Sequence, residues 1–307
     1  MRTSSAFIEA AAPVAPADLP DLLPSRPVFS SCPGEGHAIV LQRYQHPPGR
    51  IDVPGLRDHL VVLHQHLAGP VLIEDEFGGG GRDRRWSETG QVSITPAGMA
   101  KSRTLKGRTD AVLIHIAPAL VNEVAEDVYG IEAGRVAIAR CLAVFDDTLS
   151  RLGQVLAAEL EAGDPGGELM ADLLGRAIAL HLLRHHSNLA SPMPEPPNKM
   201  ASGRLHRVLD HMHAHLKETV SLAELARLSG LSPSQFARGF REATGRAPHR
   251  YLNDLRIERA RNLLESTEKS ITEIALLCGF IQPSHFTTMF RKRTGMSPRA
   301  WRAARRW

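Results

Sequence analysis

Polar side chains suited to base recognition lie on two short segments near the C-terminus of this 307-residue chain. In each segment two phenylalanines stand four residues apart, as on the buried face of a helix, and polar residues flank them. Such side chains can hydrogen-bond to base edges when a helix carries them into the major groove of DNA. We expect base contacts from Ser234, Ala237, Arg238, Pro283, Ser284, His285 and Thr288.

Arg238 is the strongest candidate for specific recognition among these residues. A guanidinium can donate two parallel hydrogen bonds to a guanine edge, a contact worth about 1–3 kcal/mol of discrimination. Side chains at the margins of the two segments suit the phosphate backbone, whose contacts position a protein without carrying sequence information. We predict phosphate contacts from Gln235, Arg241, Arg250, Arg291 and Lys292.

An internal duplication must position both segments. The run SLAELARLSG begins at Ser221, the run SITEIALLCG begins at Ser270, and each continues into a segment that contains F-R, T-G and P in that order. The copies are offset by 49 residues up to their glycines and by 50 residues from the phenylalanines onward, so the second turn holds one extra residue. Each copy has the anatomy of a helix-turn-helix, over residues 221–242 and 270–292.

Local signals predict where these helices begin and end. Ser221 and Glu224 predict a capping box, and Gly230 suits the left-handed position that ends a helix. Ser232 is a good cap for the second helix of the first unit, whereas the second unit has Gln282 there, which is a poorer cap. We therefore expect both units to bind DNA and the first unit to supply most of the sequence recognition.

A single helix is predicted over Pro248–Ser266, between the two units. Its 19 residues span roughly 28 Å at about 1.5 Å each. Successive major grooves on one face of a duplex lie about 34 Å apart, so a rigid spacer of this order suits two helices that enter neighbouring turns. One chain could then recognise a long, non-palindromic site.

Charge is distributed unevenly along the chain. Residues 203–307 hold 19 Lys+Arg against 9 Asp+Glu, whereas the first 202 residues hold 18 against 24. A basic C-terminal part joined to an acidic N-terminal part indicates a polyanionic partner, double-stranded DNA, for the C-terminal part alone.

Short β-branched runs between Gly and Pro turns fill residues 28–117 and predict a compact all-β barrel or sandwich. Strands are expected at 38–45, 59–66, 70–77, 91–95 and 111–116. A helix follows from Pro118 to Tyr129, and two amphipathic helices occupy residues 147–186. These two helices could cap the β core or form the interface of a homodimer. Residues 1–25 predict a flexible tail and the proline-rich residues 187–202 a linker.

The duplicated region resembles the DNA-binding domain of the AraC family of bacterial transcription regulators. Besides the repeated motifs, four residues fall at the family's spacing: Arg256, Ala260, Leu263 and Leu264. The resemblance covers residues 204–306. Thr288 stands where an arginine is common, and Trp301 stands where a tyrosine is usual. The resemblance implies a sequence-specific transcription regulator, which we expect to be an activator that works with RNA polymerase.

The same resemblance implies a cupin-like β-barrel over residues 26–186 that binds a small-molecule effector and carries dimerising helices. Residues 90–98 are similar to a cupin hairpin, but Lys101 stands where metal-binding cupins place a histidine. His64 and His66 resemble the paired ligands of the other cupin motif, yet no glutamate follows at the expected spacing. We therefore expect no metal and no cofactor. Candidate effector-pocket residues are Arg43, His59, His64 and Trp86.

The predicted fold class is α+β multidomain, with an N-terminal cupin-like β-barrel and helices followed by an all-α double helix-turn-helix domain at residues 203–307. No apolar run approaches the roughly 20 residues that span a bilayer, so no membrane partner is expected. Three scattered cysteines predict no disulfide and fit the cytoplasm. No catalytic constellation stands out, so we expect no enzyme. Two alternatives stay open: an effector-independent regulator, and a catalytic metal cupin fused to a DNA-binding module.

Overall fold

The computed structural model describes residues 12–31, 38–66, 69–163, 166–190 and 202–304. The chain divides into two compact units, one made of Met1–Leu67 and Val71–Met193 and the other of Ala68–Pro70 and Pro194–Trp307. We call them the N-terminal and the C-terminal domain. Most of the predicted linker, residues 191–201, lies outside the described residues, as do residues 1–11 of the predicted tail.

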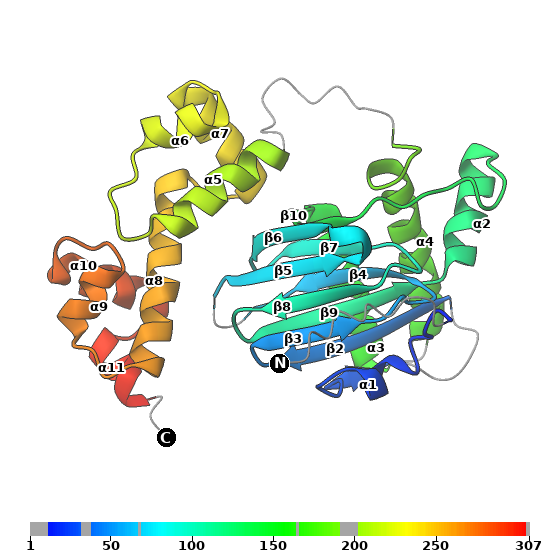
Figure 1. Ribbon diagram of the computed structural model, residues 1–307, viewed down its shortest axis with the longest axis horizontal. Coiled ribbons are helices and arrows are strands. Elements are labelled where there is room, and N and C mark those ends of the chain that lie inside the picture. The colour runs from blue at the N-terminus through cyan, green and yellow to red at the C-terminus, as the bar shows by residue number, and fades with distance from the viewer. Residues whose placement is uncertain (1–11, 32–37, 67–68, 164–165, 191–201, 305–307) are drawn as a thin grey trace. The chain divides into compact units, whose positions relative to one another are not determined.

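Two open antiparallel β-sheets build the N-terminal domain (Figure 1). The larger sheet has the strand order β1 (Phe29–Ser30), β2 (Ile39–His46), β9 (Thr109–Ile116), β4 (His59–His64), β7 (Gln91–Thr95) and β10 (Cys141–Phe145). The smaller sheet has the order β3 (Gly49–Val53), β8 (Lys101–Leu105), β5 (Val71–Phe77) and β6 (Arg82–Ser87), with the 3-10 helix η1 (Gly78–Gly80) between β5 and β6. The predicted β-rich domain is present, but its sheets do not close into a barrel, because β3 and β6 each pair on one side only. Its cupin-like identity stays a prediction. The sequence of β6, RDRRWS, is typical of a charged strand at the edge of a sheet.

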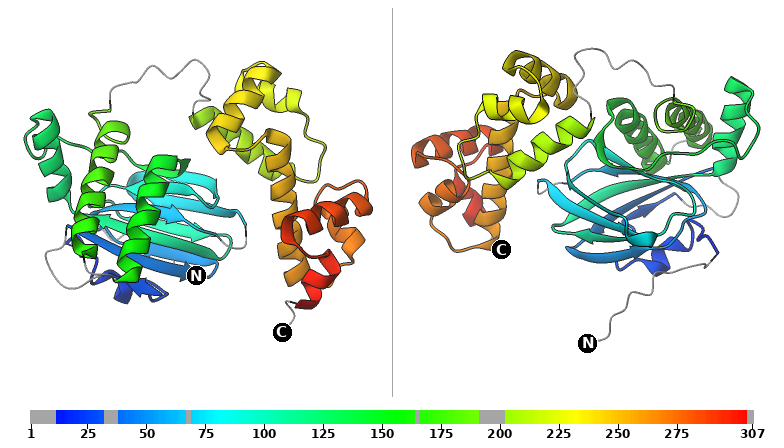
Figure 2. Two further views of the ribbon diagram at one scale, coloured as in Figure 1. Left: turned by 180° about the vertical axis from the view of Figure 1, so that it is seen from behind. Right: turned by 45° about the horizontal axis from the view of Figure 1, so that its top comes forward.

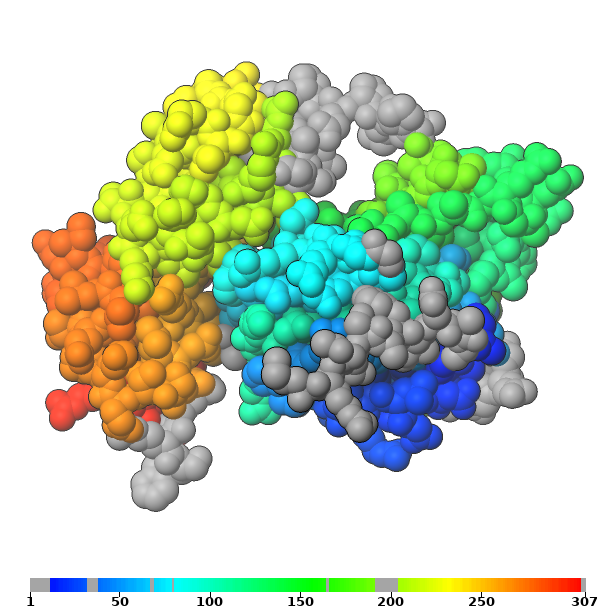
Figure 3. Space-filling model, in the orientation of Figure 1, coloured from blue at the N-terminus to red at the C-terminus, as the bar shows by residue number. Residues whose placement is uncertain are grey.

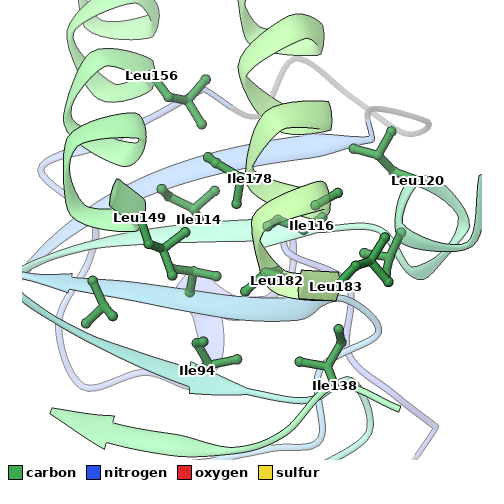
Figure 4. Packing of buried hydrophobic residues seen from close by; sticks show 14 of the residues in the cluster. Ile94, Ile114, Ile116, Leu120, Ile138, Leu149, Leu156, Ile178, Leu182 and Leu183 are labelled. Atoms are coloured by element: carbon green, nitrogen blue, oxygen red, sulfur yellow. The ribbon is translucent and has the colours of Figure 1, made fainter. Parts of the chain in front are cut away.

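Three helices cover one face of the larger sheet: α2 (Pro118–Tyr129), α3 (Asp147–Ala162) and α4 (Gly167–His185). Figure 2 shows α3 and α4 lying across the strands, and Figure 4 shows their leucines packed on the isoleucines of β7 and β9. Two glycines allow this close approach. A Cβ at Gly153 of α3 would lie 2.6 Å from Leu63, and one at Gly175 of α4 would lie 1.6 Å from Ile39. The predicted helices over 147–186 therefore do cap the core.

The smaller sheet presents a charged outer face. Glu74 and Glu76 on β5 pair with Arg84 and Arg82 on β6, at 3.2 Å in both cases. The β5–β6 hairpin lies at the surface in the space-filling view, where it is coloured cyan (Figure 3). The inward face of β5 is apolar at Val71 and Ile73, which belong to a buried cluster with Leu105 of β8, and carries one buried charge at Asp75. The alternation of charged and apolar residues therefore follows the two faces of the strand.

Residues 12–25 do not form a flexible tail. Val14 forms a parallel bridge with Leu56, and the short helix α1 (Leu19–Leu22) buries Leu19 against the larger sheet. Only 1% of Leu19 is exposed, because it packs beside Tyr44 and Leu60. The Ala/Pro-rich composition concealed this single anchoring leucine.

Over residues 202–304 the structure shows seven helices in the C-terminal domain: α5 (Ser202–Ala214), α6 (Leu222–Ser229), α7 (Pro233–Thr244), α8 (Pro248–Ser266), α9 (Ile271–Leu277), α10 (Pro283–Thr294) and α11 (Pro298–Ala304). The pairs α6–α7 and α9–α10 are the two helix-turn-helix units, and α8 joins them. The observed α8 has the bounds that the sequence predicts. In each unit we call the second helix, α7 or α10, the recognition helix.

Candidate nucleic-acid interface

Buried aromatic rings hold the first recognition helix against α8. Phe236 and Phe240 of α7 are fully buried, and their ring centroids lie 5.5 Å apart. The ring of Tyr251 on α8 meets Phe240 edge-on at 5.3 Å. Edge-to-face pairs of this kind are favourable and directional, so they fix the rotation of α7 about its own axis. The opposite face of α7 is thereby turned outward.

The second recognition helix is held in the same way. Phe286 and Phe290 of α10 are fully buried with centroids 5.6 Å apart, and Trp301 of α11 meets Phe290 edge-on at 5.9 Å. Trp301 occupies in this unit the place of Tyr251 in the first. Its indole N–H donates to Glu265 Oε1 at 3.1 Å, so the polar end of the ring is also satisfied.

Helix caps differ between the units. Ser232 and Gln235 form a complete capping box at the start of α7, whereas Gln282 makes no side-chain cap for α10, as predicted. The capping box predicted for Ser221 forms only in part. Ser221 Oγ accepts from the Glu224 N–H at 3.1 Å, but the Glu224 carboxylate contacts His211 Nε2 at 2.9 Å.

The residues predicted to contact bases lie on the outward sides of α7 and α10. Ala237 is half-buried, and the other six are exposed. Thr288 donates its hydroxyl to the Ser284 carbonyl at 3.1 Å, and the ring of His285 stands edge-on to Phe280 at 5.9 Å. The hydroxyl oxygen of Thr288 keeps its capacity to accept. The two helices therefore expose side chains of the predicted kind, and base contact itself stays a prediction.

The residues predicted to contact phosphate are all exposed. Gln235 already uses its side-chain oxygen, which accepts from the Ser232 N–H at 3.2 Å and from the Ser232 hydroxyl at 2.8 Å. Its amide N–H₂ remains the group suited to phosphate. Arg241 lies in the last turn of α7 and Arg250 in the first turn of α8, whereas Arg291 and Lys292 lie in the last turn of α10.

Two residues of α8 that the sequence did not single out for this role tie the units together. Asp254 accepts from Arg246, in the turn between α7 and α8, at 3.2 Å and from Arg293 Nε at the end of α10 at 2.6 Å. Arg256 donates to the carbonyls of Leu216 at 3.0 Å and Glu218 at 2.7 Å, in the loop before α6. The middle of the spacer helix is therefore hydrogen-bonded both to the end of α10 and to the loop before α6.

The turn before α10 contains the extra residue of the second copy. Ile281 in this turn is 82% exposed, so its side chain packs against little of the domain. Gly279 is left-handed at φ +80°, and a Cβ there would lie 2.2 Å from the Leu216 carbonyl oxygen. The turn thus needs glycine both for its backbone conformation and for close packing.

In the N-terminal domain a cavity of about 60 Å³ lies between the two sheets. Aliphatic side chains of both sheets line most of it, including Leu60 and Leu113 of the larger sheet and Ile73 and Leu105 of the smaller one. The polar lining consists of His46, His64, Lys101, Arg103 and Thr109. Space of this size would hold about four to six waters.

The cations of the cavity share one carboxylate. Arg103 makes two hydrogen bonds of 2.7 Å to Asp75, and Lys101 Nζ lies 3.3 Å from Asp75 and 2.7 Å from Thr95 Oγ1. Burial opposes ionisation of Asp75, but the two cations hold its pKa well below its usual range. Burial lowers the pKa of Lys101 to about 8. With Lys101 and Arg103 protonated and Asp75 ionised, this group of three side chains has a net charge of +1.

Of the four predicted pocket residues, His64 lines this cavity, with its Nε2 2.8 Å from Ser93 Oγ. The other three are not among its lining residues. Arg43 bonds Asp110 at 3.1 Å, and His59 Nδ1 accepts from the Ala97 N–H at 3.1 Å. Trp86 lies half-buried on the edge strand β6.

Comparison with known proteins places the similarity in the C-terminal domain. Residues 225–304 match a family model described as a helix-turn-helix domain. The chain is 40% identical over 102 residues to the HTH-type transcriptional activator RhaS of Escherichia fergusonii, covering 33% of this chain and 37% of that protein. It is 39% identical over 102 residues to RhaS of Citrobacter koseri, with the same coverage. The chain thus spans little more than a third of the length of these relatives.

Two solved structures are similar to the same region. One is a transcriptional regulator with an AraC-type DNA-binding domain from Chromobacterium violaceum, 36% identical, covering 34% of this chain and 93% of that one, with a TM-score of 0.33. The other is the DNA-binding domain of the global transcriptional factor AdpA in complex with a target DNA, 38% identical, covering 33% and 91%, with a TM-score of 0.32. Among the described residues, no helix has the length and apolarity needed to cross a bilayer.

Proposed function

Because the chain belongs to the AraC family through its C-terminal domain, we propose that it is a sequence-specific DNA-binding transcription regulator in which α7 and α10 enter successive major grooves. The observation that carries the proposal is the shared construction of the two helices. Each buries an aromatic pair and turns polar and basic side chains outward, and α8 holds both. The curated relatives are named transcriptional activators, so we propose activation, with RNA polymerase as partner in the cytoplasm.

Selection of bound fragments from genomic DNA, followed by footprinting, tests this proposal. We expect a protected site that spans two neighbouring major grooves. Arg238→Ala should weaken binding to the selected site about 5- to 150-fold, the equivalent of about 1–3 kcal/mol. Arg135→Ala is the charge-matched control, because Arg135 is a 75% exposed arginine of the N-terminal domain. Absence of a footprint, or equal affinity of the Arg238→Ala variant, would remove the assignment.

We further propose that the N-terminal domain binds a small-molecule effector in the cavity between its sheets. The apolar lining with Lys101, Arg103 and His64 suits a small anion, such as a carboxylic acid with a short apolar body. A thermal-shift screen of small carboxylic acids against their amides tests this, since a ligand that binds only the folded state raises Tm. Lys101→Met should abolish the shift, whereas an equal shift with the amides would contradict an anionic ligand.

Homodimerisation through α3 and α4 is the third part of the proposal. Leu169 and Leu173 of α4 are 67% and 56% exposed, and Val155 of α3 is 48% exposed. Leu169 and Leu173 lie one turn apart, so they share a face of α4 and a second copy of the chain could cover them. Leu169→Glu with Leu173→Glu should shift sedimentation from dimer to monomer. Leu22→Glu, at a 53% exposed leucine of α1, is the control.

A further inference from the structure

Three potential metal ligands converge where α3 begins and α4 ends. Asp146 is the N-cap of α3, and its Oδ1 accepts from the Leu149 N–H at 2.9 Å. Its other oxygen, Oδ2, lies 2.8 Å from Nε2 of His181 and 2.8 Å from Nε2 of His186. One potential ligand atom from each residue therefore lies within 4.8 Å of the other two.

The donor set has the chemistry of a transition-metal site. Two imidazoles and one carboxylate bind zinc and related first-row ions at about 2.0–2.2 Å. Around a four-coordinate ion at such lengths, neighbouring donor atoms lie about 3.3 Å apart, so each 2.8 Å contact would open by only about 0.5 Å. The side chains of Asp146, His181 and His186 are 12%, 13% and 16% exposed, which shields the group and leaves it reachable.

We propose that Asp146, His181 and His186 bind one divalent first-row transition ion, whose remaining coordination positions are filled by water. The positions of the ligands are already constrained, since Asp146 is fixed by its cap to α3 and the ring of His185 lies 4.5 Å from that of His181.

Metal binding at this place would fasten the C-terminal end of α4. Asp146 follows β10 directly, whereas His181 and His186 lie in and beside the last turns of α4. Ser187 then forms a bridge with Ile138, and Asn188 N–H donates to the Ala137 carbonyl at 2.9 Å. The ion would thus hold the segment from which the chain continues toward the C-terminal domain.

Zinc titration of the full-length chain, prepared without an affinity tag and stripped with a chelator, tests the proposal. We expect uptake of one ion per chain by calorimetry and metal analysis, and a rise in Tm that a chelator reverses. Asp146→Asn keeps an acceptor for the Leu149 N–H, because asparagine caps helices as well as aspartate does. Asp146→Asn, His181→Gln and His186→Gln should each weaken zinc binding at least tenfold, while the metal-free Tm verifies that each variant is folded.

Two controls locate the ion. His185→Gln changes an imidazole on the same helix that lies outside the group, and His211→Gln with His215→Gln removes another close pair, with ring centroids 4.2 Å apart. Both should bind zinc as the parent chain does. The assignment is overturned by absence of stoichiometric uptake in the parent, by uptake that persists in folded Asp146→Asn and His186→Gln variants, or by loss of uptake in the His211 and His215 variant alone.

Discussion

Asp254, near the middle of α8, accepts a hydrogen bond from Arg293 Nε in the last turn of α10 at 2.6 Å, and Nη2 of the same arginine contacts its other oxygen. Arg246, two residues after the end of α7, donates to Asp254 as well, at 3.2 Å. The side chain of Asp254 is only 11% exposed. One carboxylate therefore joins the ends of both recognition helices to their common spacer.

Removing this carboxylate should weaken the attachment of α10 to α8 while the domain stays folded. We expect Asp254→Ala and Arg293→Ala each to lower the free energy of unfolding by about 1 kcal/mol, since Arg293 is partly exposed and solvent screens the pair. The double variant should cost less than the sum of the single ones, because the two residues interact. Chemical denaturation measures both quantities, and additive losses would show that the pair contributes nothing.

Phosphate contacts and base contacts should have different effects on the salt dependence and the sequence preference of DNA binding. Lys292→Ala should weaken binding to all DNA sequences alike and reduce the slope of log K against log salt by about 0.9, the value for one phosphate contact. Arg238→Ala should instead relax the preference for one base pair. Binding assays over a salt series with the selected site and a scrambled one measure both effects. A changed base preference in Lys292→Ala would contradict its assignment to phosphate.

Gly279→Ala should destabilise the C-terminal domain more than Gly230→Ala does. Both glycines are left-handed, so alanine at either position costs about 1 kcal/mol of backbone strain. A Cβ at Gly230 meets no atom within 4 Å, whereas one at Gly279 would lie 2.2 Å from the Leu216 carbonyl oxygen. Thermal unfolding of the two variants gives the difference directly, and equal losses would show that the loop before α6 can yield.

Acid should destabilise the N-terminal domain through its buried histidines. Burial lowers the pKa of His66 to about 4 and that of His115 to about 3, whereas an unfolded histidine titrates near 6.5. Below pH 6.5 the unfolded chain binds protons that the folded chain does not, so this stability is present above pH 6.5 and is lost as pH falls toward 4 and 3. Denaturation at pH 4.5, 5.5 and 7.5 should show the loss, with a smaller slope in His66→Gln.

The helices of the C-terminal domain could be predicted from the sequence, because the residues that begin, end and orient each helix lie within or next to it in the chain. Phenylalanines one turn apart, glycines after helices and prolines at helix starts predict α7, α8 and α10 and their outward faces. The bonds of Asp254 were not readable, since Arg293 is 39 residues away. The group of Asp146, His181 and His186 was hidden for the same reason, and its two histidines lack the four-residue spacing that usually marks a helical pair.

The sequence did not predict strand β8, because charged side chains of this strand point into the domain. The sequence of β8, KSRTL, has the alternation of a strand, but its inward side chains are Lys101 and Arg103 rather than aliphatic residues. They are buried because Asp75 on β5 lies opposite Arg103 and accepts from both. Sequence patterns treat such residues as exposed, so the pattern concealed the strand and the polar wall of the cavity together.

The central strand β9 is a single layer between the cavity and the helices. Ala111 and Leu113 line the cavity, whereas Val112 and Ile114 face the helical core. A Cβ at Gly153 of α3 would lie only 2.9 Å from Ile114, so the backbone of α3 packs directly on this strand with no α3 side chain between them. Close-packed interiors transmit displacement rather than absorb it. The effector that we propose would press on β9 from the cavity side, and we expect that displacement to reach α3 directly, because only this strand separates the cavity from the helix.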